Sequence, residues 1–204
     1  MPFIFFALLL FFAVPAHAEE PSAQVYHTAI GMAAQGKTAE AVAALQAASA
    51  MLPAQNMWQQ RMITAAMLLQ MKQQQLHSLP ALASNSNLLL ADAYIRTHPA
   101  TSPHNPWFAG SLGTLFPGAG HAWLGRWHDA RMAAILVIPM LLLTLWAARR
   151  QMGPVTLFFA AITLWLWSGT IFSAISLSQR ENMEAYMQWW QPMWQAAALS
   201  GQPW

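Results

Sequence analysis

The chain has no cysteine and very few charged residues. The absence of cysteine excludes disulfides, thiolate metal sites, cysteine nucleophiles and a lipid-modified cysteine anchor. Asp, Glu, Lys and Arg together make up 8% of the 204 residues, and the formal net charge is +2. The basic residues are mostly scattered singly, so the composition predicts no nucleic-acid partner. The fold must therefore depend on apolar packing or on a lipid bilayer.

Two long stretches of the chain lack charge altogether. No charged residue lies between Arg131 and Arg149, and none lies between Arg150 and Arg180. At about 1.5 Å per residue, a helix over each stretch can cross a hydrocarbon layer about 30 Å thick. We therefore expect an all-α protein with a transmembrane hairpin. The hairpin is predicted over 131–178, with spans at about 131–148 and 154–177.

Residues 1–18 have the pattern of a secretory signal peptide. An apolar core precedes the small-x-small site Ala16-His17-Ala18, and cleavage is expected after Ala18. An uncleaved anchor is the alternative, and it would also export the segment that follows. Arg149 and Arg150 occupy a very short loop, as cytoplasmic positive charges do. The expected location is the bacterial inner membrane, multi-pass, with the N-terminal domain and the C-terminal tail in the periplasm.

The exported segment, residues 19–98, is rich in Ala, Gln, Met and Leu, which favours helices throughout. Part of it resembles a tetratricopeptide repeat, whose small, turn, small, large, small and closing-proline positions are occupied by Ala29, Gly36, Ala41, Leu45, Ala48 and Pro53. From Pro53 to Pro99 the spacing exceeds the usual period of about 34 residues, so a second repeat is irregular. So few units cannot bury a repeat core alone. We expect residues 21–98 to pack against the membrane segment, against a second copy in a homo-oligomer, or against a protein partner.

A nucleotide-binding pattern occurs within this region. Gly31 to Thr38 matches G-x-x-x-x-G-K-[ST], in which backbone N–H groups, Lys37 and Thr38 would serve phosphate and magnesium. A phosphate loop must follow a buried strand, whereas the preceding residues have a helical pattern. The alternative interpretation is structural: Gly36 turns one helix into the next, and Thr38 caps the second. We favour this interpretation.

A proline-rich linker, residues 99–106, separates the helical region from the membrane module. Residues 107–130 follow, and their first ten are apolar but too short to span, which predicts an interfacial or re-entrant helix. Pro117, Gly118 and Gly120 then break this helix. Small residues at such a break allow a tight turn and a close backbone approach.

The same segment resembles a motif of small bacterial membrane proteins, some of which carry tetratricopeptide repeats. The motif runs Ser-x-x-x-x-Pro-Gly-x-Gly-Gln-x-Tyr-x-Gly-Arg-x-x-x-Ala and precedes a transmembrane hairpin. It is matched by Pro117, Gly118, Gly120, Gly125, Arg126 and Ala130, with His121 at the usual Gln and Trp123 at the usual Tyr. The resemblance covers about residues 107–190 and implies a membrane protein with about two spans, but no established reaction.

Similar proteins also tend to have an aromatic-x-Gly-x-x-x-x-Ala run in the second span, and residues 167–174 resemble it. Gly169 and Ser173 form a small-xxx-small face there, which we expect to pack against Ala133 and Ala134 of the first span, with Ala174 beside it. The segment 179–204 alternates polar and aromatic residues. It is expected to form a periplasmic amphipathic tail in the membrane interface.

The polar cluster His121, His128 and Asp129 lies just before the first span. These residues could ligate a metal or transfer protons, but their spacing matches no diagnostic metal or catalytic motif. We therefore predict no catalytic, cofactor or metal site. The leading hypothesis is a non-enzymatic adaptor or envelope assembly factor that contacts membrane lipid and binds a protein partner. The alternatives are a membrane-embedded enzyme or small transport component that uses this cluster, and a lipid-interacting factor.

Overall fold

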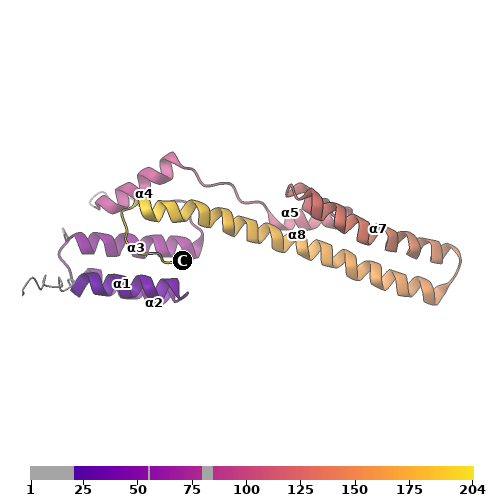
Figure 1. The fold of residues 1–204 in the computed structure, drawn as a ribbon, viewed down its shortest axis with the longest axis horizontal. Helices are drawn as coiled ribbons and strands as arrows, with labels where there is room; N and C mark the ends of the chain where they lie inside the picture. The colour runs from indigo at the N-terminus through magenta and orange to yellow at the C-terminus, as the bar shows by residue number, and fades with distance from the viewer. Residues whose placement is uncertain (1–20, 55, 80–84) are drawn as a thin grey trace, which may run out of the picture. The chain divides into compact units, whose positions relative to one another are not determined.

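The computed structural model describes residues 21–54, 56–79 and 85–204. This part of the chain forms eight α-helices and no strand, which confirms the all-α prediction for the described residues. The predicted signal peptide, residues 1–18, lies outside them. The chain divides into two compact units. We call residues up to Pro99 together with Trp190–Trp204 the helical unit, and Ala100–Trp189 the hairpin unit (Figure 1).

The helical unit contains α1 (Pro21–Ala34), α2 (Thr38–Ala50), α3 (Met57–Gln74) and α4 (Ser86–Thr97). Helices α1, α2 and α3 pack on one another, and α4 packs on α3. Of the residues that resemble a repeat, Ala29, Ala41 and Leu45 are buried, Ala48 is half-buried and Pro53 is exposed just after α2. The structure thus has two helix pairs, as the sequence predicts, while the repeat nature of both pairs stays a prediction.

The turn between α1 and α2 lies at Gly36, whose φ is +83°. The Gly36 N–H donates to the Ala33 carbonyl at 3.0 Å, and the Lys37 N–H donates to the Met32 carbonyl at 3.0 Å. This is the Schellman pattern, which needs a residue with positive φ just after the helix. The expected cap was wrong in detail, because the N-cap of α2 is Lys37 and makes no side-chain hydrogen bond.

The starts of α3 and α4 are both capped by asparagine. The Asn56 side chain accepts from the Trp58 N–H at 2.8 Å, and Asn85 accepts from the Leu88 N–H at 3.1 Å. Asn85 also reaches α3, because its amide donates to the Gln60 carbonyl at 3.0 Å and it accepts from the Thr64 hydroxyl at 3.2 Å. One buried side chain therefore starts α4 and fixes it on α3.

Residues 190–204 complete the core of the helical unit. Trp190, Met193 and Trp194 are fully buried, and the Trp190 indole donates to the Leu68 carbonyl at 3.0 Å. The Tyr26 hydroxyl donates to the Ser200 carbonyl at 2.9 Å. This corrects the expected separate interfacial tail over 179–204. A helix face rich in tryptophan is compatible with both a membrane interface and a protein core, and here Trp190 and Trp194 are buried in the core.

The hairpin unit contains α5 (Pro106–Leu115), α6 (Ala119–Trp123), α7 (Trp127–Arg149) and most of α8 (Gly153–Ala196). Helix α5 begins one residue before the segment that the sequence predicts, with Asn105 as N-cap and Pro106 in the first turn. The linker before it is irregular and attached to α8. The Asn182 side chain accepts from the His104 N–H at 2.8 Å and donates to the His104 carbonyl at 2.7 Å.

Helices α7 and α8 run side by side and are joined by the short turn Arg150–Met152 (Figure 1). The residues of α7 that are buried or half-buried at spacings of three and four are Ala130, Ala133, Val137, Met140, Thr144 and Ala147. This is the heptad stripe of two closely packed helices. Thr144 shares a hydrogen bond of 3.1 Å with Thr163 of α8, so this pair satisfies its polar groups inside the hairpin.

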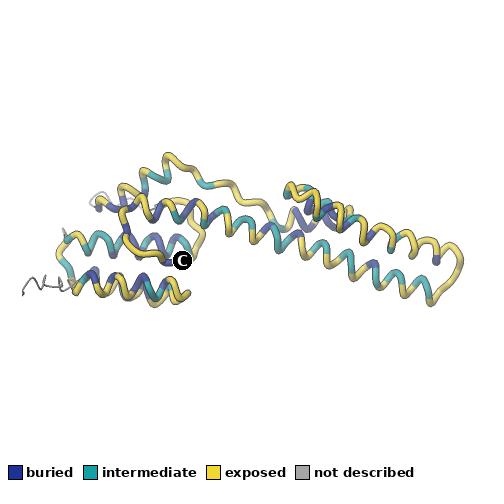
Figure 2. Tube along the Cα trace, viewed as in Figure 1, coloured by how far each residue is buried: buried dark blue, intermediate teal, exposed yellow. Residues whose placement is uncertain are grey.

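Both helices are long and apolar enough to cross a membrane. Their outer faces are largely exposed, as Figure 2 shows for α7, and carry large apolar side chains. Ile135, Leu142 and Trp146 of α7 and Leu157 and Phe158 of α8 are examples. Soluble monomers rarely expose contiguous apolar surface on this scale.

Helix α8 is one helix of 44 residues, which at about 1.5 Å per residue is roughly 66 Å long. The sequence predicts a span that ends near residue 177 and a distinct tail after it. Instead the helix continues to Ala196 without a break. Its apolar first half belongs to the hairpin unit, and its last turns from Trp190 belong to the helical unit.

Candidate functional site

The Pro-Gly-Ala-Gly turn between α5 and α6 is a point of close backbone approach. A Cβ atom at Gly118 would fall on the carbonyl oxygen of Ala130, and one at Gly120 would fall on that of Ala109. The Gly120 Cβ would also lie 2.9 Å from the Cβ of Ala174. The φ of Gly118 is +89°. These two glycines therefore let α6 touch α5, α7 and α8 at once.

The remaining motif residues end α6 and begin α7. Gly125, with φ +79°, follows α6, and the Arg126 N–H donates to the His121 carbonyl at 2.9 Å, again a Schellman pattern. Arg126 is the N-cap of α7. The Trp123 ring meets the Phe108 ring edge-on at 5.1 Å, and Pro117 is half-buried in the turn.

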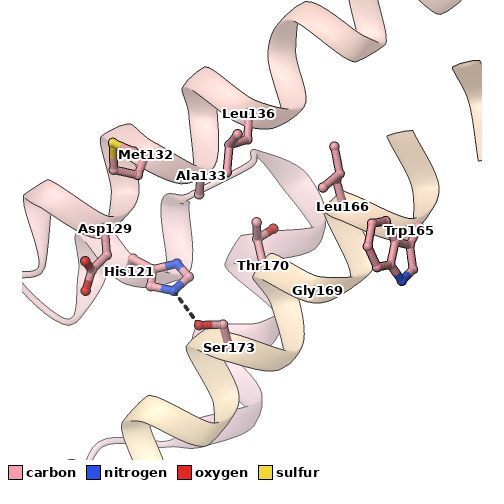
Figure 3. A pocket seen from close by; sticks show the side chains of 10 residues that line it. All are labelled: His121, Asp129, Met132, Ala133, Leu136, Trp165, Leu166, Gly169, Thr170 and Ser173. Carbon is pink, nitrogen blue, oxygen red and sulfur yellow. Dashed lines mark hydrogen bonds between the residues drawn. The ribbon is translucent and has the colours of Figure 1, made fainter. Parts of the chain in front are cut away.

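His121 is almost fully buried, with 5% of its surface exposed. Its Nε2 lies 3.2 Å from the Ser173 hydroxyl of α8 (Figure 3). Burial lowers the pKa of His121, while Asp129 opposes this and Arg126 adds to it. The imidazole is therefore neutral near pH 7, with one nitrogen that donates and one that accepts.

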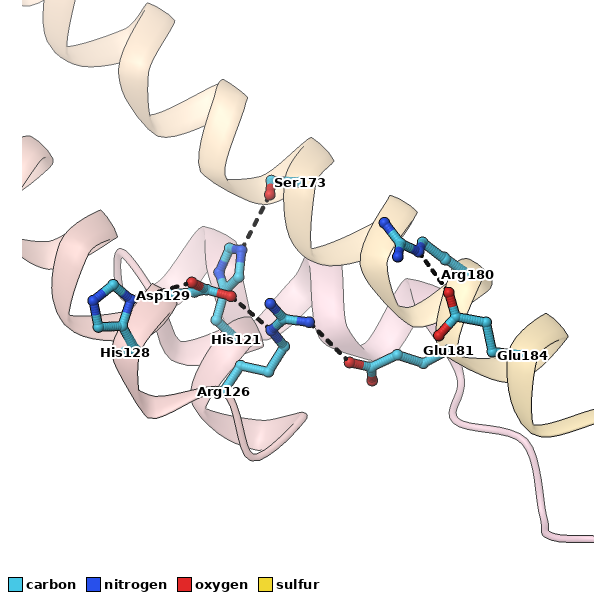
Figure 4. Close-up of polar contacts among 8 residues, drawn as sticks. All are labelled: His121, Arg126, His128, Asp129, Ser173, Arg180, Glu181 and Glu184. Carbon is cyan, nitrogen blue, oxygen red and sulfur yellow. Dashed lines mark hydrogen bonds and ion pairs between the residues drawn. The ribbon is translucent and has the colours of Figure 1, made fainter. Parts of the chain in front are cut away.

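A network of charged residues lies beside His121 (Figure 4). Arg126 Nε lies 2.6 Å from the Asp129 carboxylate, and Arg126 Nη1 lies 3.5 Å from Glu181 of α8. The hydrogen bond from Arg126 holds the pKa of Asp129 below its usual value, and the same bond raises the pKa of Arg126. Of the predicted cluster, the structure brings His121 and Asp129 near each other. The His128 side chain is 80% exposed and only its Nδ1 reaches Asp129, at 3.5 Å.

A groove of about 460 Å³ opens between α7 and α8 from this network (Figure 3). His121, Asp129 and Ser173 lie at one end, and Leu136 and Trp165 lie at the other. The full lining is His121, Asp129, Met132, Ala133, Leu136, Trp165, Leu166, Gly169, Thr170 and Ser173. The volume lies within the range of about 300–1,000 Å³ that small-molecule sites occupy.

The expected helix contact at Gly169 is wrong in position. A Cβ at Gly169 would meet no atom within 4 Å, so this glycine forms the floor of the groove rather than a packing surface. Close packing of α8 occurs one to two turns later, where Ala174 is buried against Gly120. Ser173 serves as the partner of His121.

The pair His121 and Ser173 has the distance of a base and a nucleophile, but the arrangement lacks the other parts of that chemistry. A catalytic base needs a third group to orient it. The Asp129 carboxylate bonds to Arg126 and His128 instead. Among the residues that the structure describes, no three His, Asp or Glu side chains are grouped to hold a metal ion.

The nucleotide-like pattern does not form a phosphate loop. Its Gly36 and Lys37 N–H groups, which would bind phosphate, donate to carbonyls of α1 instead. The segment before it is helical rather than a strand. The structure therefore supports the structural interpretation of this pattern.

Three contacts of the hairpin unit were not anticipated from the sequence. Gly110 and Gly113 face Ile175 and Ile171, and the Trp167 indole donates to the Gly113 carbonyl at 2.8 Å. The spacing of Gly110 and Gly113 on one face of a short apolar helix is the signal that could have identified α5 as packed on α8.

Comparison of the chain with models of protein families, with curated proteins and with solved structures finds no match.

Proposed function

We propose that the chain is a non-enzymatic integral protein of the bacterial inner membrane whose helical unit binds a protein partner in the periplasm, as an adaptor or envelope assembly factor. In this proposal α7 and the apolar half of α8 cross the bilayer. Their exposed apolar faces and the internal Thr144–Thr163 hydrogen bond support it. The predicted signal peptide and the Arg149-Arg150 turn support the orientation.

The helical unit itself supports the common location of its two segments. Residues before α7 and residues after the apolar half of α8 share one core, through Trp190 and Leu68 among others. In this proposal both segments therefore lie on the same side of the membrane. An even number of crossings between them, two in this proposal, satisfies this requirement.

The main support for partner binding is the exposed apolar face of α4. The core of the helical unit is closed by residues 190–204, yet Leu89 and Leu90 of α4 remain 52% and 48% exposed. Ala93, one turn on, is exposed too, and the ion pair of Asp92 and Arg96 at 2.8 Å flanks the apolar residues. An apolar face with a polar rim is typical of a helix that docks on another protein.

Photocrosslinking in native membranes tests this proposal. A photoreactive phenylalanine at position 89 should give one discrete crosslinked protein, whereas the same residue at exposed Gln46 of α2 should not. Leu90→Lys in the position-89 variant should abolish the crosslink without lowering the amount of membrane-inserted protein. Equal crosslinking from both positions, or none from position 89, would contradict the proposal.

A further inference from the structure

The groove between α7 and α8 has an amphiphilic lining that no part of the proposed adaptor role uses. Apolar side chains, Met132, Leu136, Trp165 and Leu166, form its walls. At one end it presents the His121 ring, the Ser173 hydroxyl and the Asp129 carboxylate. Hydrocarbon fits the walls, and a hydrogen-bonding group fits the end.

The charges at the polar end select against an anionic group. No Lys or Arg lines the groove, and Arg126 is already paired with Asp129 and with Glu181, so a phosphate there would meet the Asp129 carboxylate without an unpaired cation. The ligand does not need a positive charge to neutralise Asp129 either, because Arg126 Nε already lies 2.6 Å from its carboxylate. Neutral His121 and Ser173 can each donate or accept a hydrogen bond. The polar end therefore matches an uncharged hydroxyl.

The absence of a side chain at Gly169 leaves room in the groove for a chain of methylene groups. Gly169 has open space where its Cβ would be, and its φ is not in the left-handed region. The backbone conformation there is compatible with a larger side chain, which would occupy part of the groove in proportion to its size.

We propose that this groove binds a neutral lipid with a hydroxyl head, of the diacylglycerol class, with one acyl chain along α7 and α8 and the hydroxyl at His121 and Ser173. The inference rests on the proposed insertion of the hairpin, and it is independent of the partner face on α4. Binding at this site is distinct from ordinary solvation by the bilayer because it is saturable and selective for the head group.

Photolabelling of the full chain tests the proposal. The protein is reconstituted in phosphatidylcholine vesicles with a trace of diacylglycerol that carries a diazirine in one acyl chain. Adducts at 132–136 and 165–170 should be displaced by excess diacylglycerol and not by the same amount of phosphatidylglycerol or phosphatidylethanolamine. Adducts on the outer face, at Leu142 and Leu157, should resist displacement and so report that the hairpin is inserted.

Variants of two helical glycines provide the matched comparison. Gly169→Leu should abolish the displaceable adducts, and Gly169→Ala should reduce them. Gly31→Leu in α1, where a Cβ also meets open space, should leave them unchanged. Ser173→Ala should weaken displacement by diacylglycerol about 2- to 10-fold, the range expected for one lost hydrogen bond.

Four results would overturn the inference. They are groove adducts that persist in Gly169→Leu, equal displacement by the phospholipids, equal loss in Gly31→Leu, and fatty-acid release that depends on Ser173. The last would identify a hydrolytic rather than a binding site. Absence of adducts at Leu142 and Leu157 as well would show failure of membrane insertion, and with it failure of the proposed function and of this inference together.

Discussion

Gly120 and Gly169 lie in the same unit with opposite surroundings. A methyl group at Gly120 would meet the Ala109 carbonyl and the Ala174 side chain, whereas one at Gly169 would meet nothing within 4 Å. Gly120→Ala should therefore destabilise the hairpin unit by about 1–3 kcal/mol, as overpacking does. Gly169→Ala should be neutral or stabilise it by up to about 1 kcal/mol through helix propensity.

Thermal unfolding of the detergent-solubilised protein measures both variants. A loss in Gly169→Ala as large as that in Gly120→Ala would contradict the predicted difference. Gly31→Ala in α1, with the same helix-propensity gain and no packing change, serves as the control.

His121 predicts a pH dependence of stability. Its folded-state pKa is below the usual value of 6.5, so the unfolded chain binds the proton first as the pH falls. The stability is therefore complete above about pH 6.5 and decreases as the pH falls below it. His121→Gln introduces the residue that is usual at this position of the membrane-protein motif. In this variant the decrease in stability should be smaller between about pH 7.5 and about pH 5.5.

Unfolding midpoints of the hairpin unit at several pH values check this prediction. Exposed His128 gives the matched control, since His128→Gln should retain the decrease. A parallel decrease in the wild-type protein and in His121→Gln would show that His121 does not cause it.

At the scale of residues, the turn was predictable and its partners were not. Pro117, Gly118 and Gly120 predict a break with close backbone approach, because glycine is the residue that permits it. Which backbone comes close depends on how α5, α7 and α8 pack, and no local pattern encodes that. Gly169 was expected in a helix contact because it is small. The packing of α7 and α8 leaves a groove at this position instead, which the local sequence does not reveal.

At the scale of elements, the last turns of α8 contribute more to the stability of the helical unit than the interfacial tail expected from the sequence would. Trp194 is fully buried, and its indole donates to the Gly201 carbonyl at 3.0 Å. Trp194→Ala should destabilise the helical unit by about 3–5 kcal/mol. Trp107→Ala, at a residue 76% exposed on α5, should change that unit's stability by less than about 0.5 kcal/mol.

Limited proteolysis of α1–α4 under increasing urea distinguishes the two variants. If the aromatic residues of α8 lay in a lipid interface, as the sequence suggested, Trp194→Ala would leave this protection unchanged. Tyr26→Phe offers a milder test of the same contact, because it removes only the 2.9 Å hydrogen bond to Ser200.

The helices themselves were largely predictable from the sequence. Apolar periodicity together with Gly36, Asn56, Asn85 and Asn105 locates most helix ends, since these residues satisfy backbone groups locally. The role of residues 190–204 was not predictable. A tryptophan-rich amphipathic segment is stabilised equally by lipid headgroups and by a complementary apolar face, and only the three-dimensional arrangement decides between them.

At the scale of the whole molecule, the proposed topology gives a direct prediction. Alkaline carbonate should leave the protein in the membrane pellet. An alkaline phosphatase fused after Pro99 or after Trp204 should be active in the periplasm, and one fused at Gly153 should be inactive. An active fusion at Gly153, or different activities at the first two positions, would contradict a hairpin with both ends on one side.

The discontinuous core of the helical unit imposes an order on biosynthesis. When the ribosome has polymerised every residue through Trp189, helices α1–α4 are complete, but Trp190, Met193 and Trp194 are still missing from their centre. The core of the helical unit therefore stays open while α5, α6, α7 and most of α8 are synthesised. We therefore expect the open apolar surface to need shielding during that interval, and we expect shortened products that stop before Trp190 to be susceptible to proteolysis.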